Sequence, residues 1–377
     1  MRLLYLTRGC NIHDRRFLQA FASHGWTIGF ASLTRPDIGD PYNVIPDGAR
    51  HLVWLGLRPK PSTDELRVAA ANLRPAVVNF QPEIVLAGPV HDGGFVAAQA
   101  ALPCPWVVQS WAFDVLWEIE RDADALARAR IVLQACPGLL ADSRAVIQKC
   151  ESIAGRSLEK QFLLPWGIDL ANTKPAKARS AVRAELGIGP QTVFLCTRGL
   201  EAKYRIDVLL DAFRKFQASD RNAVLLLASE GSLRSGLETQ VKADGLANSV
   251  KFLGAVDHHH LLDLFAASDF FVSTAESDGT SIALLEAMYL GVIPIVSNVG
   301  GNPEWIRHGI NGWLAESGDA DDFARALNLG RQMTESRRLG AIQSNRNLVQ
   351  SRADWTLNFS RWLSELTQLA HPPTSDK

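Results

Sequence analysis

The fold is decided most clearly by residues 269–288, which read DFFVSTAESDGTSIALLEAM. A short apolar run of strand length leads into a polar bend at Gly279, and a segment of helix-forming residues follows. When strands, loops and helices alternate along a chain, they predict a parallel sheet with helices on both faces. Glu286 departs from this pattern, because it is a charged residue inside an otherwise apolar helix.

Short apolar runs alternate with helix-like segments over the whole chain. In the first half the predicted strands fall at residues 2–6, 27–32, 51–55, 83–87, 106–110 and 138–142. In the second half they fall within residues 192–199, 223–231, 250–256, 269–279, 292–301 and 311–316. Each half therefore predicts an α/β domain built on a doubly wound, Rossmann-like parallel sheet.

A break in this alternation separates the two halves. Residues 162–180 contain Pro165, Gly167 and Pro175 and show little periodicity. The chain of 377 residues also exceeds the ~250–300 residues at which a single core stops growing, so two domains are expected. We expect an acceptor-side domain at 1–166, a donor domain at 167–354, a final helix at 355–370 that packs back on the first domain, and a flexible tail at 371–377.

The first predicted helix covers residues 14–25. Asp14 is a residue type that caps helix amino ends, and Gly25 is the type that follows helix carboxyl ends. We expect these two residues to mark its limits.

The composition excludes several classes of protein. Lys and Arg together number 39 against 40 for Asp and Glu, so no overall positive field attracts nucleic acid. The five cysteines are widely spaced without a C-x-x-C pair, which is typical of reduced thiols in a cytoplasmic protein. No segment approaches the ~20 apolar residues of a membrane-spanning helix. We expect a cytoplasmic protein, and peripheral contact with the inner membrane surface stays open.

Two cations lie at and beyond the end of the strand predicted within residues 192–199. Arg198 leaves the strand, and Lys203 comes just before the next predicted helix. Cations beside a helix amino terminus form a plausible clamp for a diphosphate. Two solvated surface cations are the alternative, since Arg and Lys are seldom buried.

The bend in the opening stretch carries a second candidate site. Thr280 or Ser281 can cap the helix, while Gly279 lets the backbone approach a ligand. Asp278 then lies near the positive end of the helix dipole, and Glu286 lies roughly 9 Å further along the axis. This spacing suits two grips on an elongated polyol, although it does not by itself exclude the carboxylate pair of an inverting glycosidase. A surface acid on a helix is the alternative for Glu286.

Other motifs argue against metal and cofactor chemistry. His258, His259 and His260 are consecutive, so they cannot all face one ion from a helix. The DAD at 122–124 lies in a charge-mixed, helix-like segment and is interpreted as a solvated face. There is no G-x-G-x-x-G after the first strand and no G-x-x-x-x-G-K-[ST], which argues against a nicotinamide dehydrogenase and a P-loop NTPase.

The second half resembles the retaining GT-B glycosyltransferases of family 4, the glycosyl transferases group 1. The resemblance rests on TRGLEAK, the SEGS turn at 229–232, VKFLGAV, AASDFFVSTAESDGTSIALLEAM and VGGNPEWIRHGINGWL, in the order of the family. It covers most of residues 163–315. The first half is similar only more loosely, in MRLLYLTRG, AGPVHDGGFVAA, SWAFDVL and LLADSRAV.

The resemblance implies a GT-B fold, in which two Rossmann-like domains face a cleft, and it implies roles for individual residues. Arg198 and Lys203 would hold the donor diphosphate, and Glu286 would bind the ribose hydroxyls. Asp278 would contact the donor sugar. The remaining donor-binding residues would be Gly279, Thr280, Ser281 and Ile282 beside the sugar and diphosphate, and Gly254 and Val256 beside the base. No metal or other cofactor is implied.

The chain departs from the family pattern at several positions. Asp278 stands where the family usually has Glu, and Tyr204 replaces the glycine after the clamp lysine. Trp111 and Ala112 replace a His-Gly pair that is common in the first half, so Asp114 becomes the candidate functional residue there.

Two further features of the first half concern the acceptor. His91, in the loop GPVHDGG, is a second acceptor-side candidate, and a satisfied core histidine is the alternative. Arg15 and Arg16 could meet an anionic acceptor such as a lipid phosphate, and a solvated helix end is the alternative.

We therefore expect a metal-independent, retaining hexosyltransferase with Asp278, Asp114 and His91 as catalytic candidates. Its donor would be a nucleotide-diphosphate sugar, and its acceptor a carbohydrate, a lipid-linked molecule or a small molecule. Two alternatives stay open, a non-catalytic nucleotide-sugar-binding protein and a GT-B nucleotide-sugar epimerase.

Overall fold

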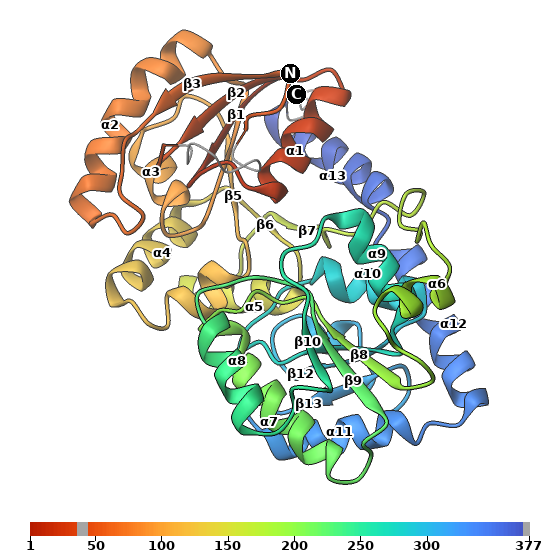
Figure 1. Ribbon diagram of the computed structural model, residues 1–377. Helices are drawn as coiled ribbons and strands as arrows, with labels where there is room; N and C mark the ends of the chain where they lie inside the picture. The colour runs from red at the N-terminus through yellow and green to blue at the C-terminus, as the bar shows by residue number, and fades with distance from the viewer. Residues whose placement is uncertain (36–43, 372–377) are drawn as a thin grey trace. The chain divides into compact units, whose positions relative to one another are not determined.

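The computed structural model describes residues 1–35 and 44–371. The chain divides into two compact units, drawn with their helices and strands in Figure 1. The first unit comprises Met1–Leu164 and Phe359–Lys377, and the second comprises Pro165–Asn358. Of the tail expected at 371–377, only the first residue lies within the described residues.

The first unit contains a parallel sheet of seven strands in the order β3-β2-β1-β4-β5-β6-β7. Leu4 of β1 lies opposite Gly29 on one side and Val85 on the other, so the first strand is central and fully covered. The strands are β1 (Arg2–Thr7), β2 (Thr27–Ser32), β3 (Ala49–Trp54), β4 (Ile84–Ala87), β5 (Trp106–Gln109), β6 (Gly138–Ala141) and β7 (Gln161–Leu163).

Helices cover this sheet. Leu4 and Leu6 belong to a core that they share with residues of α2, α3, α4 and α5. The helices of the unit are α1 (Ile12–Ser23), α2 (Thr63–Phe80), α3 (Gly93–Gln99), the short π-helix η1 (Asp114–Glu118), α4 (Ala123–Ala135), α5 (Arg144–Ala154) and the C-terminal α13 (Trp355–Ala370).

The helix α13 packs against α1, and the two lie side by side in Figure 1. Phe359 and Trp362 of α13 meet Phe17 and Phe21 of α1, with ring centroids 5.1 to 6.2 Å apart. Trp362 and both phenylalanines of α1 are buried. The last helix of the chain thereby completes the core of the first unit.

The amino end of α1 differs from the prediction. Asn11 is the N-cap, and its side chain accepts hydrogen bonds from the backbone of His13 and Asp14. Asp14 occupies the third helical position and accepts a hydrogen bond from the backbone N–H of Asn11, which completes a capping box. The prediction of Asp14 as the cap was therefore wrong by three residues, almost one helical turn, whereas Gly25 does follow the helix in a left-handed conformation.

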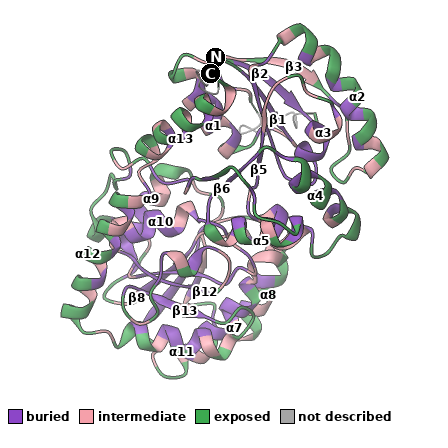
Figure 2. Ribbon diagram, turned by 180° about the vertical axis from the view of Figure 1, so that it is seen from behind, coloured by how far each residue is buried: buried purple, intermediate pink, exposed green. Residues whose placement is uncertain are grey.

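The second unit contains a parallel sheet of six strands in the order β10-β9-β8-β11-β12-β13. Its inner strands, like those of the first sheet, are coloured as buried in Figure 2. The strands are β8 (Thr192–Cys196), β9 (Ala223–Leu227), β10 (Val250–Phe252), β11 (Phe270–Ser273), β12 (Ile293–Ser297) and β13 (Trp313–Ala315).

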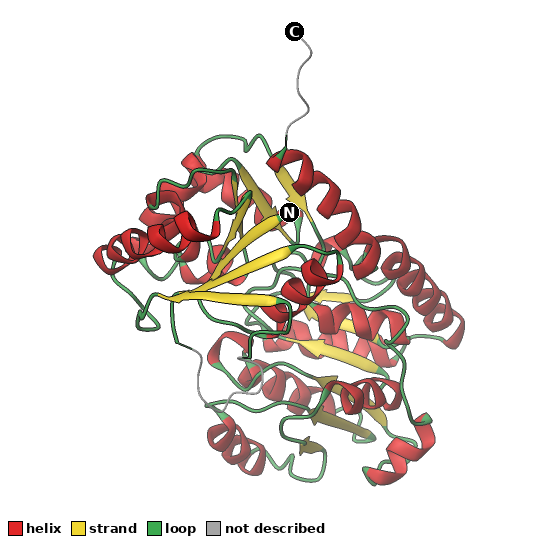
Figure 3. Ribbon diagram, turned by 90° about the horizontal axis from the view of Figure 1, so that it is seen from above, coloured by secondary structure: helices red, strands yellow, loops and turns green. Residues whose placement is uncertain are grey.

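Alternate residues of β8 serve two different cores. Phe194 and Cys196 join a core with residues of α7 and α11, whereas Val193 and Leu195 join a second core with residues of α9 and α10. Helices therefore cover both faces, as the red helices around the yellow strands in Figure 3 illustrate. They are α6 (Arg179–Glu185), the 3-10 turn η2 (Ala202–Tyr204), α7 (Ile206–Gln217), α8 (Arg234–Ala243), α9 (His258–Ala267), α10 (Ile282–Leu290), the 3-10 turn η3 (Asn302–Glu304), α11 (Ala320–Arg331) and α12 (Glu335–Arg352).

The strand order reverses once in each sheet. In the first unit the reversal lies between β1 and β4, and in the second it lies between β8 and β11. Loops that leave neighbouring strands at such a reversal diverge to opposite faces and leave a crevice at the carboxyl edge, where ligands bind in doubly wound sheets. The loops after these four strands are therefore the positions to inspect for a site.

Candidate functional site

Arg198 lies at the reversal of the second sheet, two residues beyond β8. Its Nε donates to the Ser273 hydroxyl at 3.0 Å, and its Nη2 donates to the Ser281 hydroxyl at 2.8 Å. The same Nη2 pairs with the Asp278 carboxylate. The loop after β8 and the loop after β11 are thus joined through one guanidinium, as the prediction of a shared site requires.

The amino end of α10 lies in this cluster. Ser281 is its N-cap and accepts a hydrogen bond from the backbone N–H of Leu284, while Ile282 is the first helical residue. Thr280 is buried and accepts a hydrogen bond from Trp305 Nε1 at 3.4 Å. Gly279 precedes them and is buried. The backbone N–H groups of this turn give the site a partial positive charge beside Arg198.

Asp278 is held from both sides of the loop. Its side chain is 14% exposed and faces Arg198, while its carbonyl accepts a hydrogen bond from the backbone N–H of Gly301 at 3.1 Å. Burial raises the pKa of Asp278 above its ordinary value, and the positive charge of Arg198 only partly offsets this. Gly301, in the loop after β12, therefore belongs to the same loop cluster.

Lys203 and Arg198 approach the same aromatic ring. The Lys203 ammonium lies 5.1 Å from the centre of the Tyr204 ring, and the Arg198 guanidinium lies 5.6 Å from it. An aromatic face attracts cations through its quadrupole. Tyr204, which replaces the family's glycine, thus brings the two predicted clamp cations to one place.

Glu286 is buried in α10, with 5% of its side chain exposed. Its Oε1 lies 2.6 Å from Nε2 of His258, the first residue of α9. His258 follows the loop after β10 that contains Gly254 and Val256, and Gly254 adopts a left-handed conformation there. The contact between His258 and Glu286 therefore joins the predicted ribose and base positions, and it argues against Glu286 as a solvated surface acid.

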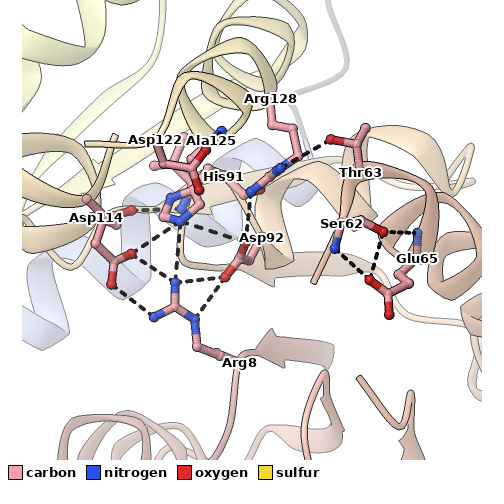
Figure 4. Close-up of polar contacts among 12 residues, drawn as sticks. Arg8, Ser62, Thr63, Glu65, His91, Asp92, Asp114, Asp122, Ala125 and Arg128 are labelled. Atoms are coloured by element: carbon pink, nitrogen blue, oxygen red, sulfur yellow. Dashed lines mark hydrogen bonds and ion pairs between the residues drawn. The ribbon is translucent and has the colours of Figure 1, made fainter. Parts of the chain in front are cut away.

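The reversal of the first sheet carries a second polar cluster, drawn in Figure 4. Arg8, just after β1, donates from Nε to Asp92 at 2.9 Å and from Nη2 to Glu118 at 2.9 Å. Arg128 of α4 donates to the carbonyl of His91 at 2.9 Å and to the Thr63 hydroxyl at 3.1 Å. Two arginines and two acids from distant parts of the sequence thus meet at this edge.

His91 lies inside this network. Its Nε2 is 3.2 Å from Glu118 Oε2 and 3.4 Å from Arg8 Nη2. Its Nδ1 is buried and has no hydrogen-bond partner within residues 1–35 and 44–371. Burial opposes the charge of Glu118, but the hydrogen bonds from His91 and Arg8 outweigh it and lower the pKa of Glu118 to about 2.

Asp114, predicted as a functional residue, is the first residue of η1 and is buried. Its carboxylate accepts hydrogen bonds from the backbone N–H of Val90, the Ser110 hydroxyl and the backbone N–H of Trp111, at 2.8 to 2.9 Å. Burial raises its pKa above the ordinary value. Asp114 therefore ties the loop after β4 to the loop after β5, which contains Ala112 at a positive φ of 64°.

Potential metal ligands are present in both clusters, but they are not arranged around a common position in the described part of the chain. Within the described part of the chain, no group of three or more His, Cys, Asp or Glu side chains is placed to hold a metal ion. His258 points to Glu286 instead, and Asp122 caps the amino end of α4. No helix in the same part of the chain is long and apolar enough to cross a bilayer.

The sequence did not point to several residues of these clusters. Two of these residues could have been found from the sequence. Arg8 directly follows β1, and Asp92 directly follows His91, the candidate histidine of that loop. The contacts of Glu118 and His258 could not be found in this way. Glu118 contacts Arg8, 110 residues away in the sequence, and His258 contacts Glu286, 28 residues away.

Comparison with known proteins bears first on the Arg198 cluster of the second unit. The family model described as Glycosyl transferases group 1 matches residues 179–338, which include the loops after β8 and β11. The chain is therefore similar to the glycosyl transferases group 1 family over these residues.

Two curated proteins share part of the sequence with this chain. The GDP-mannose-dependent monoacylated alpha-(1-6)-phosphatidylinositol monomannoside mannosyltransferase of Corynebacterium glutamicum is 30% identical over 174 residues, 44% of this chain and 45% of that protein. The D-inositol 3-phosphate glycosyltransferase of Rhodococcus jostii is 31% identical over 184 residues, 47% of this chain and 40% of that protein. The chain thus spans less than half of the length of these relatives.

Solved structures resemble the whole chain at low sequence identity. Anabaena HepE, solved with UDP, gives a TM-score of 0.79 at 19% identity and covers 98% of this chain and 100% of that chain. Sucrose-phosphate synthase from Thermosynechococcus elongatus also gives 0.79 at 19% identity, covering 97% and 99%. The chain has the GT-B fold of two Rossmann-like units.

Proposed function

We propose that this chain is a glycosyltransferase that transfers a sugar, with retention at the anomeric carbon, from a nucleotide-diphosphate sugar to an acceptor hydroxyl. The observation that carries the proposal is the position of Arg198 at the reversal of the second sheet, beside the amino end of α10. A guanidinium and a helix amino terminus together favour a bound diphosphate. The GDP-mannose in the name of the Corynebacterium glutamicum protein and the UDP bound to HepE support the same class of donor.

The second unit would supply the donor site. Arg198 and Lys203 would bind the diphosphate, with the backbone of residues 279–282 beside it. Glu286 would bind the ribose hydroxyls, and residues 254–256 would lie beside the base. Asp278 would contact the donor sugar. While no donor is bound, its carboxylate would balance the positive charge of Arg198.

The first unit would supply the acceptor site. His91 is proposed to contact the acceptor, since it lies at the reversal of the first sheet with an unpartnered Nδ1. Asp114 is proposed to act by holding the two loops beside it. Domains at 1–166 and 167–354 would correspond to these two roles.

The reaction is proposed to need no metal ion. Fixed cations and a helix amino terminus can neutralise a leaving diphosphate, and both are present beside Asp278. We expect the same turnover in excess EDTA as in added Mg²⁺. A cytoplasmic enzyme would have such donors at hand.

The proposal is tested with a panel of UDP, GDP, ADP and CDP and the corresponding nucleotide sugars. A ligand at 100 times its dissociation constant stabilises the folded state by about 2.7 kcal/mol, so the correct nucleotide raises the melting temperature. Release of the nucleoside diphosphate is then measured with sugar acceptors. The anomeric proton coupling of the product, read by NMR, shows retention or inversion.

The same panel separates the alternatives. An epimerase converts the nucleotide sugar into an isomer without any acceptor. A non-catalytic binding protein is stabilised by the nucleotide sugar but releases no diphosphate with any acceptor. An absence of stabilisation by every nucleotide would contradict all three functions.

A further inference from the structure

The first unit contains a small pocket at the reversal of its sheet. The pocket has a volume of about 160 Å³, below the ~300–1,000 Å³ of a site for a drug-sized ligand, so it holds one end of a molecule. Its lining comes from the end of β1 and the loop after it, the N-cap of α1, the loop after β4, and the segment from the loop after β5 through η1. The residues used below are Thr7, Arg8, Asn11, Trp111, Phe113, Asp114 and Glu118.

The pocket contains one cation, and two carboxylates already pair with its charge. Arg8 is the sole Lys or Arg among the described residues that line it, and its side chain is 35% exposed. Nε and Nη2 reach Asp92, while Nη1 and Nη2 reach the two oxygens of Glu118. The guanidinium therefore faces two carboxylates, and a third acid, Asp114, also lines the pocket.

Nearby basic groups add no charge to the pocket. Arg128 is buried and directed at the His91 carbonyl and Thr63, and it does not line the pocket. His13, whose ring lies 5.8 Å from that of Trp111, is neutral at physiological pH, because burial lowers its pKa to about 4. Arg15 and Arg16 lie on α1, each with an interaction of its own, and do not line the pocket.

The remaining lining suits hydroxyl groups and a ring. Thr7 and Asn11 carry polar side chains, and the Glu118 oxygens can accept hydrogen bonds from hydroxyl groups. Trp111 and Phe113 give the pocket aromatic walls, against which the C–H face of a sugar ring packs. A phosphate in the same place would meet more carboxylates than free cations and would be repelled.

We propose that this pocket binds the uncharged, hydroxylated ring of the acceptor and rejects phosphorylated acceptors. This inference rests on the proposed glycosyltransferase function and narrows its acceptor class. It sets the chain apart from the D-inositol 3-phosphate glycosyltransferase of Rhodococcus jostii, whose name specifies a phosphorylated acceptor.

The test uses matched pairs of acceptors with the full-length protein and the nucleotide sugar that stabilises it. The pairs are glucose, mannose, N-acetylglucosamine and myo-inositol against glucose 6-phosphate, mannose 6-phosphate, N-acetylglucosamine 6-phosphate and inositol 3-phosphate. The expected kcat/KM is at least tenfold higher for the neutral member of every reacting pair. A phosphorylated member that reacts equally well or better overturns the inference.

The variant Glu118→Gln tests whether the pairing of Glu118 with Arg8 causes the preference for neutral acceptors. It releases Arg8 from one carboxylate, so the preference for the neutral member should fall by about tenfold. The matched control is Glu120→Gln, because Glu120 is exposed and pairs with Lys149 instead. If the Glu118→Gln protein folds and its preference for neutral acceptors is unchanged, the proposed role of Arg8 is wrong. If this variant does not fold, the acceptor pairs measured with the wild-type protein decide the acceptor class.

Donor binding and acceptor-free hydrolysis, measured in the same samples, separate the two levels of the proposal. When the protein binds or hydrolyses the donor and no neutral acceptor reacts, the acceptor inference is wrong and the donor assignment stands. When no nucleotide sugar binds, the proposed function itself is wrong, and this inference falls with it.

Discussion

At the scale of single residues, Arg198 contributes more contacts to the proposed donor site than its neighbours, because it reaches Ser273, Asp278 and Ser281. Loss of a hydrogen bond to a charged group weakens binding by about 1.5–3 kcal/mol, or about 10- to 150-fold. We expect Arg198→Ala to lower kcat/KM for the donor by that factor, as measured by release of nucleoside diphosphate. Arg214→Ala, a change of an exposed arginine on α7, is the control, and full activity in Arg198→Ala would contradict the donor assignment.

Glu286→Gln keeps the shape of the side chain but removes its charge. A ribose diol donates two hydrogen bonds to a carboxylate and only one of them finds an oxygen in an amide. We therefore expect a weaker nucleotide affinity, by about tenfold, with an unchanged melting temperature of the free protein. The measurement is calorimetric titration with the nucleoside diphosphate, and Glu276→Gln, in the preceding loop and paired with Arg205, is the matched control.

Asp14 should make the first unit more stable in mild acid than in base. Burial raises its pKa to about 7 from an ordinary value of 3.8, against the hydrogen bonds from Asn11 and Tyr5. The folded state therefore holds this proton more tightly than the unfolded state, so the stability it contributes is complete below pH 3.8 and is lost as the pH rises through 7. Between pH 5 and pH 8 the loss amounts to about 2–3 kcal/mol.

The variant Asp14→Asn should remove this loss, because an amide keeps an oxygen for Tyr5 and does not titrate. The free energy of unfolding in urea, compared at pH 5 and pH 8, is the measurement. Asp64→Asn, an exposed acid in the first turn of α2, should leave the pH dependence as it is in the wild type. An equal loss in Asp14→Asn would show that another group causes it.

The sequence could predict that Arg198 and Asp278 lie close together, whereas their role in donor binding stays a prediction. Arg198 and Asp278 each follow a predicted strand, and adjacent parallel strands bring their carboxyl ends together. The Arg8–Glu118 pair escaped prediction, since 110 residues separate the partners and nothing in one segment specifies the other. The contacts of the Tyr204 ring with Arg198 and Lys203 could not be predicted either, because they depend on the path of the loop.

At the scale of elements, the amino end of α10 combines two tasks in Ser281. Its hydroxyl accepts from the Leu284 backbone and from Arg198. Ser281→Ala should cost about 1 kcal/mol of stability, as lost caps do, and should also weaken nucleotide binding. Ser143→Ala removes the cap of α5 in the first unit and should cost similar stability with unchanged nucleotide affinity, by thermal melting and titration. Equal nucleotide affinity in Ser281→Ala and Ser143→Ala would contradict a role of Ser281 in nucleotide binding.

The strands illustrate what periodicity can and cannot locate. Each predicted strand overlaps one observed strand, because buried parallel strands are continuous apolar runs. The strand β7 was missed, since it has three residues of which Gln161 and Leu163 are exposed at the sheet edge. Such a strand is specified by its backbone pairing with β6, which leaves no apolar pattern in the sequence.

At the scale of the whole molecule, the first unit depends on the last helix. Trp362 of α13 is buried against Phe17 and Phe21, and truncation of a buried tryptophan costs about 3–5 kcal/mol. We expect Trp362→Ala to lower the unfolding free energy of the first unit by that amount, measured in urea. Leu357→Ala, on the same helix but 52% exposed, should change it by less than about 0.5 kcal/mol. Comparable effects of the two substitutions would contradict this packing role.

The second unit is continuous in sequence, whereas the first is closed by a segment from the far end of the chain. During synthesis at roughly 5–20 residues per second, the nascent first unit waits on the order of 10–40 s before α13 emerges. Over that interval the Phe17 and Phe21 rings of α1 lack their partners, which presents an apolar face to holdase chaperones at the ribosome. The second unit, in contrast, is complete in sequence at Asn358, before most of α13 has been synthesised.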